Sequence, residues 1–185
     1  MILGTRVGLR AIEREDLPVL LAWRNRPEFR RYFREVRELG AGQQAQWFET
    51  VATGDPRTHM FAIWELKTRT LIGACGLCYI DWVNRTADFS IYIGHEGRYI
   101  DDAYAPDAGR TLLRYGFDEL GLHRIWCEIY GFDHAKQRLL PGLGFVLDGR
   151  HRESHWAEGA WHDSLFYGIL DREFATRSRD NEEAA

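Results

Sequence analysis

A mixed α/β fold, with helices on both faces of a partly parallel sheet, is predicted from three features of the sequence. Residues 86–93 alternate apolar and polar side chains, which is typical of a strand. Residues 106–120 place apolar side chains at helical spacing. A strand, a short helix and another strand are then predicted between residues 123 and 147, and such alternation indicates a sheet with parallel neighbours.

The first half of the chain is expected to form one strand, two helices and an antiparallel meander. Residues 7–12 alternate like a strand, and Pro18 suits the first turn of a helix that ends before Pro27. A second helix is predicted over 43–53. Strands with short turns between them follow over 60–66, 71–80 and 86–93.

The second half begins with a loop over 94–105 and the amphipathic helix. Gly121 fits the position just past the end of that helix. A strand at 123–130, a helix at 133–140 and strands at 144–147 and 165–170 follow. Pro141 and Gly142 are expected to shorten the helix at 133–140, and Gly149, Gly159 and the charged residues between them indicate a hairpin.

Composition limits the classes of protein to which the chain can belong. At 185 residues, residues 1–175 are expected to form a single domain, and the charged residues 176–185 a flexible C-terminal tail. A net charge of −4 argues against nucleic-acid binding, and no apolar run approaches the ~20 residues that span a bilayer. Three cysteines cannot all pair with one another, which favours a cytoplasmic location.

Several short strings resemble the GNAT superfamily of acyltransferases, most of all the branch that acetylates ribosomal-protein N-termini. They occur in the family's order and span about residues 8–174. The strings are Leu9-Arg10-Ala11-Ile12, Trp23-Arg24-Asn25, Leu71-Ile72-Gly73, Arg85-Thr86-Ala87-Asp88-Phe89, Leu120-Gly121-Leu122-His123-Arg124, Leu143-Gly144-Phe145 and Trp161-His162-Asp163. The resemblance implies a GNAT fold with a splayed central sheet flanked by helices.

The resemblance also implies an N-acyltransferase that uses acetyl-CoA or another acyl-CoA and needs no metal. Backbone groups of one strand would polarise the thioester, and a loop at a helix N-terminus would bind the pyrophosphate. The positions that match these donor contacts are Ile91, Tyr92, Ile93, Arg98, Asp102, Ala103, Tyr104, Ala105 and Asp133.

The pyrophosphate loop departs from the family pattern. Asp101 and Ala103 stand where the first two glycines would be, and a carboxylate about 4 Å from a phosphate costs about 1 kcal/mol even in water. Alternatively, Asp101 and Asp102 merely favour the positive end of the helix. Lys136 and Leu140 replace the Ser or Tyr expected near the leaving sulfur. A repurposed cleft therefore stays open as an alternative, either with a carrier-protein thioester or aminoacyl ester as donor or as a non-catalytic binding module.

Polar residues on two strands are the candidates for catalysis. Asp88 shares one face of its strand with Ser90 and Tyr92, and its carboxylate could accept the amine proton. A salt bridge to an arginine on a neighbouring strand is its plain alternative. Tyr130 could supply a proton to the leaving group, although strand tyrosines commonly serve packing.

The acceptor is expected to be an amine of a small molecule or peptide. The positions assigned to acceptor binding are Arg24, Tyr32, Ser90 and Trp161, and residues 149–161 are expected to form a loop on the acceptor side. Cys75 and Cys78 face opposite ways on a strand and are expected to be buried, inert thiols, and a homodimer is a candidate assembly.

Overall fold

An eight-stranded mixed sheet forms the body of the protein in a computed structural model, which describes residues 1–183, with side chains as far as residue 177. The strand order is β1-β2-β3-β4-β5-β6-β8-β7. The strands are β1 Ile2–Leu3, β2 Val7–Ala11, β3 His59–Glu65, β4 Thr70–Asp81, β5 Thr86–Ile93, β6 Arg124–Tyr130, β7 Val146–Ala157 and β8 Ala160–Leu170. Only β5 and β6 pair in parallel among these strands. The predicted mixed α/β class is confirmed.

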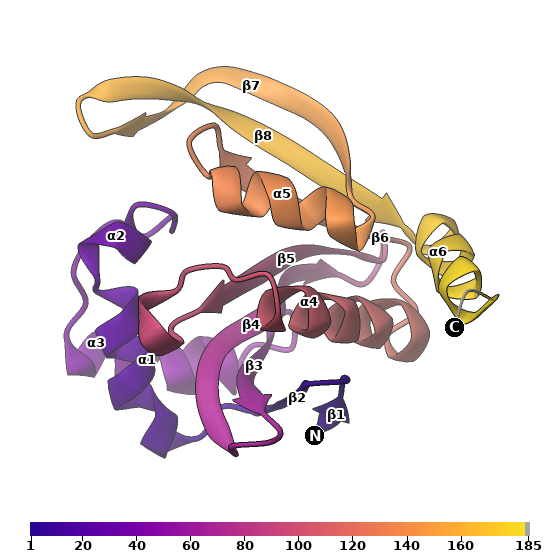
Figure 1. The fold of residues 1–185 in the computed structure, drawn as a ribbon. Helices are drawn as coiled ribbons and strands as arrows, with labels where there is room; N and C mark the ends of the chain where they lie inside the picture. Colours follow the sequence, from indigo (N-terminus) through magenta and orange to yellow (C-terminus); the bar gives the residue numbers. More distant parts are fainter. Residues whose placement is uncertain (184–185) are drawn as a thin grey trace.

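Helices lie on both faces of the sheet, as the sequence predicts (Figure 1). They are α1 Leu17–Arg24, α2 Pro27–Arg30, α3 Ala41–Trp47, α4 Tyr104–Arg114, α5 His134–Leu143 and α6 Asp171–Glu183. The larger core lies between the sheet and α4 with α5, where Ile91 packs, and the smaller lies against α1 to α3, where Tyr92 packs. Neighbouring residues of β5 therefore face opposite cores, as the alternation predicts.

The central sheet is splayed between β5 and β6. The parallel ladder joins Thr86 to Arg124, Ala87 to Ile125 and Asp88 to Trp126, and pairing stops there although both strands continue. The last five residues of β5 and the last four of β6 therefore border a gap in the sheet. This gap is the part of the fold that positions the candidate site.

The hairpin predicted over 149–161 is confirmed, and it is the end of a longer one. Strands β7 and β8 continue to a tight turn at Glu158 and Gly159, where Gly159 adopts a φ of 78°. Two register shifts interrupt the pairing, which explains why simple alternation fails to mark the strand. The hairpin tip reaches across to α2, and Glu158 forms an ion pair with Arg31 at 3.0 Å (Figure 1).

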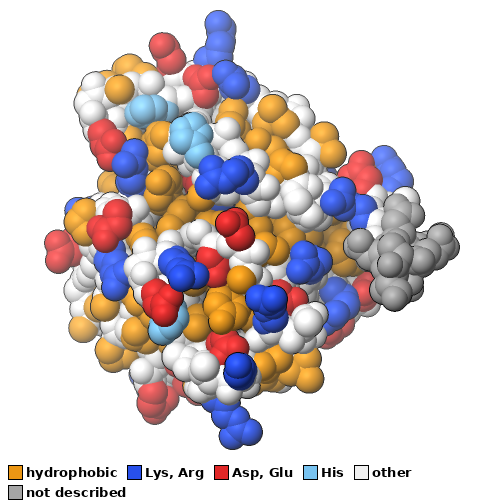
Figure 2. Space-filling model, viewed as in Figure 1, with side chains coloured by type: hydrophobic (Ala, Val, Ile, Leu, Met, Phe, Trp, Pro, Cys, Tyr) orange, Lys and Arg blue, Asp and Glu red, His pale blue; other side chains and the backbone are white. Residues whose placement is uncertain are grey.

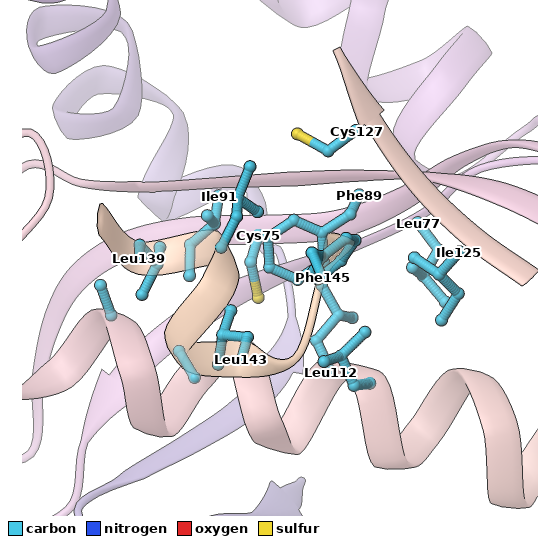
Figure 3. Close-up of a cluster of buried hydrophobic side chains, with 14 of the residues drawn as sticks. Cys75, Leu77, Phe89, Ile91, Leu112, Ile125, Cys127, Leu139, Leu143 and Phe145 are labelled. Carbon is cyan, nitrogen blue, oxygen red and sulfur yellow. The ribbon is translucent and has the colours of Figure 1, made fainter. Parts of the chain in front are cut away.

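Helix α5 does not stop at Pro141, contrary to prediction. It continues through Pro141 and Gly142 to Leu143, and Gly144 ends it in the left-handed region at φ 101°. Proline removes a single helical hydrogen bond this close to the end, and buried leucines on either side hold the turn in place. Figure 3 shows Leu139 and Leu143 pointing toward the sheet, near Ile91 and Phe145. Core packing therefore outweighs local propensity here.

Three further segments differ from the predictions. A short first strand, β1, pairs with β2 and was not expected. The expected helix over 43–53 is α3 followed by one π-helical turn at Phe48–Ala52. Residues 176–183 of the expected tail continue α6, and residues 184–185 lie outside the described residues.

Candidate active site

A cavity of about 680 Å³ opens beside the gap in the sheet. Strand β5 lines the cavity with three side chains that alternate along one face of the strand: Asp88, Ser90 and Tyr92. Glu128 and Tyr130 line it from β6, and Lys136 reaches it from the first turn of α5. The predicted polar face of β5 and the predicted Tyr130 of β6 are therefore brought together.

Asp88 is buried and paired with an arginine that the sequence did not single out. Its Oδ2 atom accepts a hydrogen bond from Nη1 of Arg34 at 2.6 Å, and the same guanidinium lies 3.4 Å from Glu128. Arg34 also sits over the rings of Tyr79 and Trp126. The expected alternative of a salt bridge is thus present, but its arginine comes from the segment between α2 and α3, not from a neighbouring strand.

Burial decides the electrostatics of Asp88. Removal from water raises the pKa of the carboxyl, the Arg34 guanidinium opposes that rise, and the nearby Glu128 adds to it. The net direction is upward, because Asp88 is only 5% exposed whereas Arg34 remains partly in solvent. A carboxyl with a raised pKa is better suited to accept a proton from an amine.

Tyr130 faces the cavity, but its ring is also part of an aromatic stack. It lies parallel to His155 of β7, with ring centroids 3.5 Å apart, and burial raises the pKa of its hydroxyl. Trp161 does not line the cavity. It pairs edge-on with Trp156 near the hairpin tip and is 58% exposed. The structure therefore separates Trp161 from the other predicted acceptor residues.

Arg24 and Tyr32 line the cavity from the side of α1 and α2. Arg24 donates from Nη2 to the carbonyl of Glu35 and stacks over Phe33, and its buried Nη1 atom has no partner. Tyr32 stacks on Tyr99 with ring centroids 4.2 Å apart. Both positions therefore border the cavity beside the gap in the sheet.

The N-terminus of α4 is closed by the chain itself. The Oδ1 atom of Asp101 accepts hydrogen bonds from the backbone N–H groups of Tyr104 at 2.9 Å and Ala105 at 2.8 Å. The next residue, Pro106, has no N–H group. The first-turn groups expected to meet a pyrophosphate are therefore already bonded to a carboxylate, as the helix-end alternative predicts for Asp101.

The other oxygen of Asp101 has no hydrogen-bond donor. Oδ2 is buried, makes no hydrogen bond, and lies 4.0 Å from the exposed guanidinium of Arg98. Asp102 is exposed. A diphosphate does not fit at these amides while Asp101 holds them, because the two anions would compete for the same donors.

The N-terminus of α5 is capped in a similar way, but here both oxygens of the capping carboxylate are bonded. Asp133 accepts from the backbone N–H of Lys136 and from the hydroxyl of Tyr99, each at 3.0 Å. Asp133, expected to contact the donor, caps this helix and accepts a hydrogen bond from Tyr99. The Tyr99 carbonyl in turn accepts from the N–H of Ile93 at 2.8 Å.

The backbone of β5 still offers one donor to the gap. Because N–H groups alternate in direction along a strand, Ile91 points its N–H to the same side as Ile93, toward the gap. The N–H of Ile93 is engaged by Tyr99, and the ladder with β6 has ended before Ile91. Of the three predicted backbone positions, Ile91 is thus the one whose N–H group could donate a hydrogen bond into the gap.

The two cysteines of β4 face opposite ways, as predicted. Cys75 is buried in the larger core, whereas Cys78 lines the cavity and contacts the sulfur of Met60. Burial raises the pKa of both thiols, to about 12 for Cys78, so neither is a thiolate at neutral pH.

Comparisons with known proteins agree on one family. The family described as acetyltransferase (GNAT) domain matches residues 6–146. The uncharacterised N-acetyltransferase p20 of Bacillus licheniformis is 28% identical over 92% of this chain and 96% of its own length. The putative ribosomal N-acetyltransferase YdaF of Bacillus subtilis is 35% identical over 57% of this chain and 56% of its own.

A solved structure has the same fold. The spermidine N-acetyltransferase of Vibrio cholerae, solved in complex with CoA and spermine, superposes with a TM-score of 0.85 at 24% identity, covering 93% of this chain and 99% of that one. The face of the present protein seen in Figure 2 carries positive and negative side chains interspersed. Over the described residues, no helix combines the length and apolar character needed to cross a membrane.

Proposed function

The chain belongs to the GNAT acetyltransferase family, and on that premise we propose that it transfers an acetyl group from acetyl-CoA to an amine of a small molecule or peptide. One observation carries this proposal. A buried carboxylate, Asp88, lies at the point where β5 and β6 part, beside the free backbone edge of β5 and within the cavity. A candidate base, a backbone N–H that could donate to the thioester carbonyl, and space for an acceptor are thus adjacent.

The geometry supports direct attack of the amine on the thioester. The amine nitrogen would form a bond to the carbonyl carbon while Asp88 accepts its proton. The N–H of Ile91 would donate to the carbonyl oxygen, where negative charge develops. The bond from carbon to sulfur then breaks, and the thiol leaves. No covalent enzyme intermediate is needed, because both reactants would be held side by side.

A small-molecule amine is the favoured acceptor. The named relatives include a spermidine N(1)-acetyltransferase of Vibrio cholerae, 26% identical over 95% of this chain. The cavity holds the carboxylates of Asp88 and Glu128, and an arginine of the chain occupies both of them. An amine acceptor would take the position of that guanidinium when it approaches Asp88.

The test is acetyl transfer by the purified protein. Acetyl-CoA is offered with spermidine, with a tripeptide that has a free N-terminus, and with glucosamine, and release of the free thiol is recorded. We expect amine-dependent release with at least one acceptor, confirmed by mass spectrometry of the acetylated product. Thiol release that is the same with and without every amine would contradict acyl transfer to an amine.

The cap on α4 supports a second candidate, in which the donor is a thioester or ester without a diphosphate at this place. Asp101 holds the two amides that a diphosphate would need. Asp101→Gly frees both amides and removes one negative charge, and we expect the affinity for CoA to rise at least about fivefold, since about 1 kcal/mol of repulsion is removed. Calorimetry with CoA measures this change.

Asp102→Gly is the matched control for that experiment. It removes the same charge from the same loop, but Asp102 is exposed and holds neither amide. If CoA is the natural donor, the unaltered protein binds it and Asp101→Gly tightens binding more than Asp102→Gly. If neither variant binds CoA, the donor is of the second kind.

A further inference from the structure

Arg24, the last residue of α1, lines the cavity without a carboxylate partner. Its Nη2 atom donates to the backbone carbonyl of Glu35 at 2.9 Å, and its Cζ atom lies 4.3 Å from the centre of the Phe33 ring. Its Nη1 atom is buried and makes no hydrogen bond. Among the residues whose side chains the structure describes, no carboxylate lies within 4.0 Å of this guanidinium. Burial lowers the pKa of Arg24, but an arginine stays charged at neutral pH.

The four carboxylates that line the cavity all have partners in the chain. Arg34 forms ion pairs with the acids of β5 and β6. Arg37 pairs with Glu35 at 2.6 Å, so Glu35 gives Arg24 only its backbone carbonyl. Asp55 accepts hydrogen bonds from the turn that precedes β3. The counter-charge of Arg24 is therefore to be sought in a bound molecule, because a buried charge without one is unfavourable.

The cavity as a whole has no excess of negative charge. Four acidic and four basic side chains line it, so the two signs balance. A polyamine carries several positive charges and no negative one, and Arg24 would repel it. An acceptor with one amine and one anionic group is the better match, because the amine would replace the Arg34 guanidinium beside Asp88 while the anion meets Arg24.

Arg24 and Asp88 lie at opposite ends of the polar face of β5. The Phe33 ring beside Arg24 also contacts the ring of Tyr92, with centroids 5.4 Å apart, whereas Asp88 is four residues earlier on the same strand. Four residues of strand span about 13 Å, so the two charged groups are separated by on the order of 10 Å. An extended chain of about three residues covers this distance, and a single α-amino acid does not.

We propose that Arg24 binds a carboxylate of the acceptor, and that the acceptor is an elongated molecule with an amine at one end and a carboxylate at the other. A short peptide and a long ω-amino acid both have this chemistry. The inference rests on the proposed acyl transfer and narrows its acceptor. A guanidinium presents paired donors that fit a carboxylate. The Phe33 ring, which lines the same cavity, would turn aside to open Nη1 to that carboxylate.

The experiment compares acceptors that differ only in the carboxylate. Triglycine and 8-aminooctanoate each place a carboxylate about 10 Å from the amine. Triglycinamide and 8-aminooctanamide are their uncharged counterparts, and glycine and spermidine complete the set. The donor is the acetyl thioester of N-acetylcysteamine, which lacks a diphosphate, so the Asp101 cap does not affect it. The value of kcat/KM is recorded for each acceptor.

We expect the unaltered protein to prefer the better long carboxylate over its amide by about 10- to 100-fold in kcat/KM, mostly through KM. Which of the two pairs shows the larger preference separates a peptide from an ω-amino acid. Glycine and spermidine should be poorer acceptors than that carboxylate. Arg24→Gln should abolish the preference and change the rates with the amides only a few-fold. Arg24→Lys keeps the charge and should retain part of the preference.

Arg37→Gln is the matched control, because it removes a cation of the same cavity that already has a carboxylate partner. The preference for the carboxylate should persist in this variant. Calorimetry with the acetylated products, the N-acetyl derivatives of 8-aminooctanoate and triglycine and of their amides, measures the site without turnover. It should show the same preference and the same loss in Arg24→Gln.

Equal use and equal binding of carboxylate and amide by the unaltered protein would overturn the role of Arg24. So would equal losses with both in Arg24→Gln, since a merely structural arginine affects both alike. Faster transfer to spermidine than to either carboxylate would overturn the acceptor class. Carboxylate-dependent binding of the products without acetylation of any amine would overturn the proposed acyl transfer and leave the anion site standing, so the two failures are distinguishable.

Discussion

Two buried aspartates of this protein each hold an arginine at almost the same distance, yet their surroundings differ. Asp16 lies 2.7 Å from Arg10, and Asp88 lies 2.6 Å from Arg34. Arg10 bonds both oxygens of Asp16, and the N–H of Glu13 adds a third hydrogen bond. Asp88 receives one hydrogen bond from its arginine.

The pKa values of the two carboxyl groups therefore shift in opposite directions. Burial opposes the charge of Asp16, but the hydrogen bonds from Arg10 and Glu13 outweigh it and lower the pKa. Burial dominates at Asp88 and raises the pKa, and Glu128 nearby adds to the effect. A fully satisfied pair fastens a helix to a strand, whereas a deeper and less satisfied pair keeps a carboxyl ready to accept a proton.

The largest expected effect is on turnover. Asp88→Asn keeps the shape of the side chain but cannot accept the amine proton, so we expect kcat for amine acetylation to fall about 100-fold or more. Steady-state kinetics with the fastest acceptor measures this loss. Asp16→Asn is the same chemical change at the other pair and should leave turnover almost unaltered. A similar loss in both variants would show that the rate follows general destabilisation, not a base at position 88.

Stability should be affected more by the change at Asp16 than by the change at Asp88. Asp16→Asn breaks a charged, multiply bonded pair, and we expect a loss of about 2 kcal/mol, which for a chain of this size lowers Tm by about 4–8 °C. Asp88→Asn should leave Tm unchanged or slightly higher at neutral pH, because it removes a charge that burial disfavours. Calorimetric melting of both variants tests this, and a larger drop at position 88 would refute the distinction.

The pH dependence should separate the two residues further. Asp16, with a lowered pKa, contributes stability that is present above pH 4 and is lost as the pH falls through its folded pKa. Asp88, with a raised pKa, contributes stability only at low pH, and it loses that contribution as the pH rises through its folded pKa. Activity should therefore appear with rising pH above the ordinary range of an aspartate. An acid limb at or below pH 4 would contradict a raised pKa at Asp88.

The smallest expected effect is on the pH dependence of the rate, when Arg34 is replaced. Arg34→Gln removes the largest of the charges that oppose the raised pKa of Asp88, so the acid limb of the rate profile should move to higher pH. The rate on the alkaline side should change only a few-fold, since the base itself is intact. Arg37→Gln is the control, because Arg37 lines the same cavity but pairs with Glu35. A profile that moves equally in both variants would exclude a specific effect of Arg34.

Much of the fold could be predicted from local sequence patterns. Alternation along residues 86–93 assigned Asp88, Ser90 and Tyr92 to one face of β5 and Ile91 to the other, and the structure places them so. The amphipathic spacing after residue 104 located α4. These patterns succeed because side-chain direction along a strand or helix is set by backbone geometry alone.

Other features could not be predicted in that way. The full length of the hairpin over 146–170 could not be predicted, because register shifts break its alternation. Pro141 is typical of a helix end, although core leucines hold the helix together. Tryptophan is common in binding sites, but Trp161 lies near the tip of the hairpin, where its side chain is exposed. No local signal marks Arg34, which belongs to an irregular segment between two helices.

The sequence by itself determined which faces of the strands are polar, where the sheet and its helices lie in the chain, and that Asp101 and Lys136 stand at unusual positions of a GNAT acetyltransferase. Only the tertiary structure decided what those groups meet. Arg34 and Asp88 are 54 residues apart, and their pairing depends on the path of a loop over the cavity. Contacts of this kind are set by packing between distant segments, which the pattern of neighbouring residues does not encode.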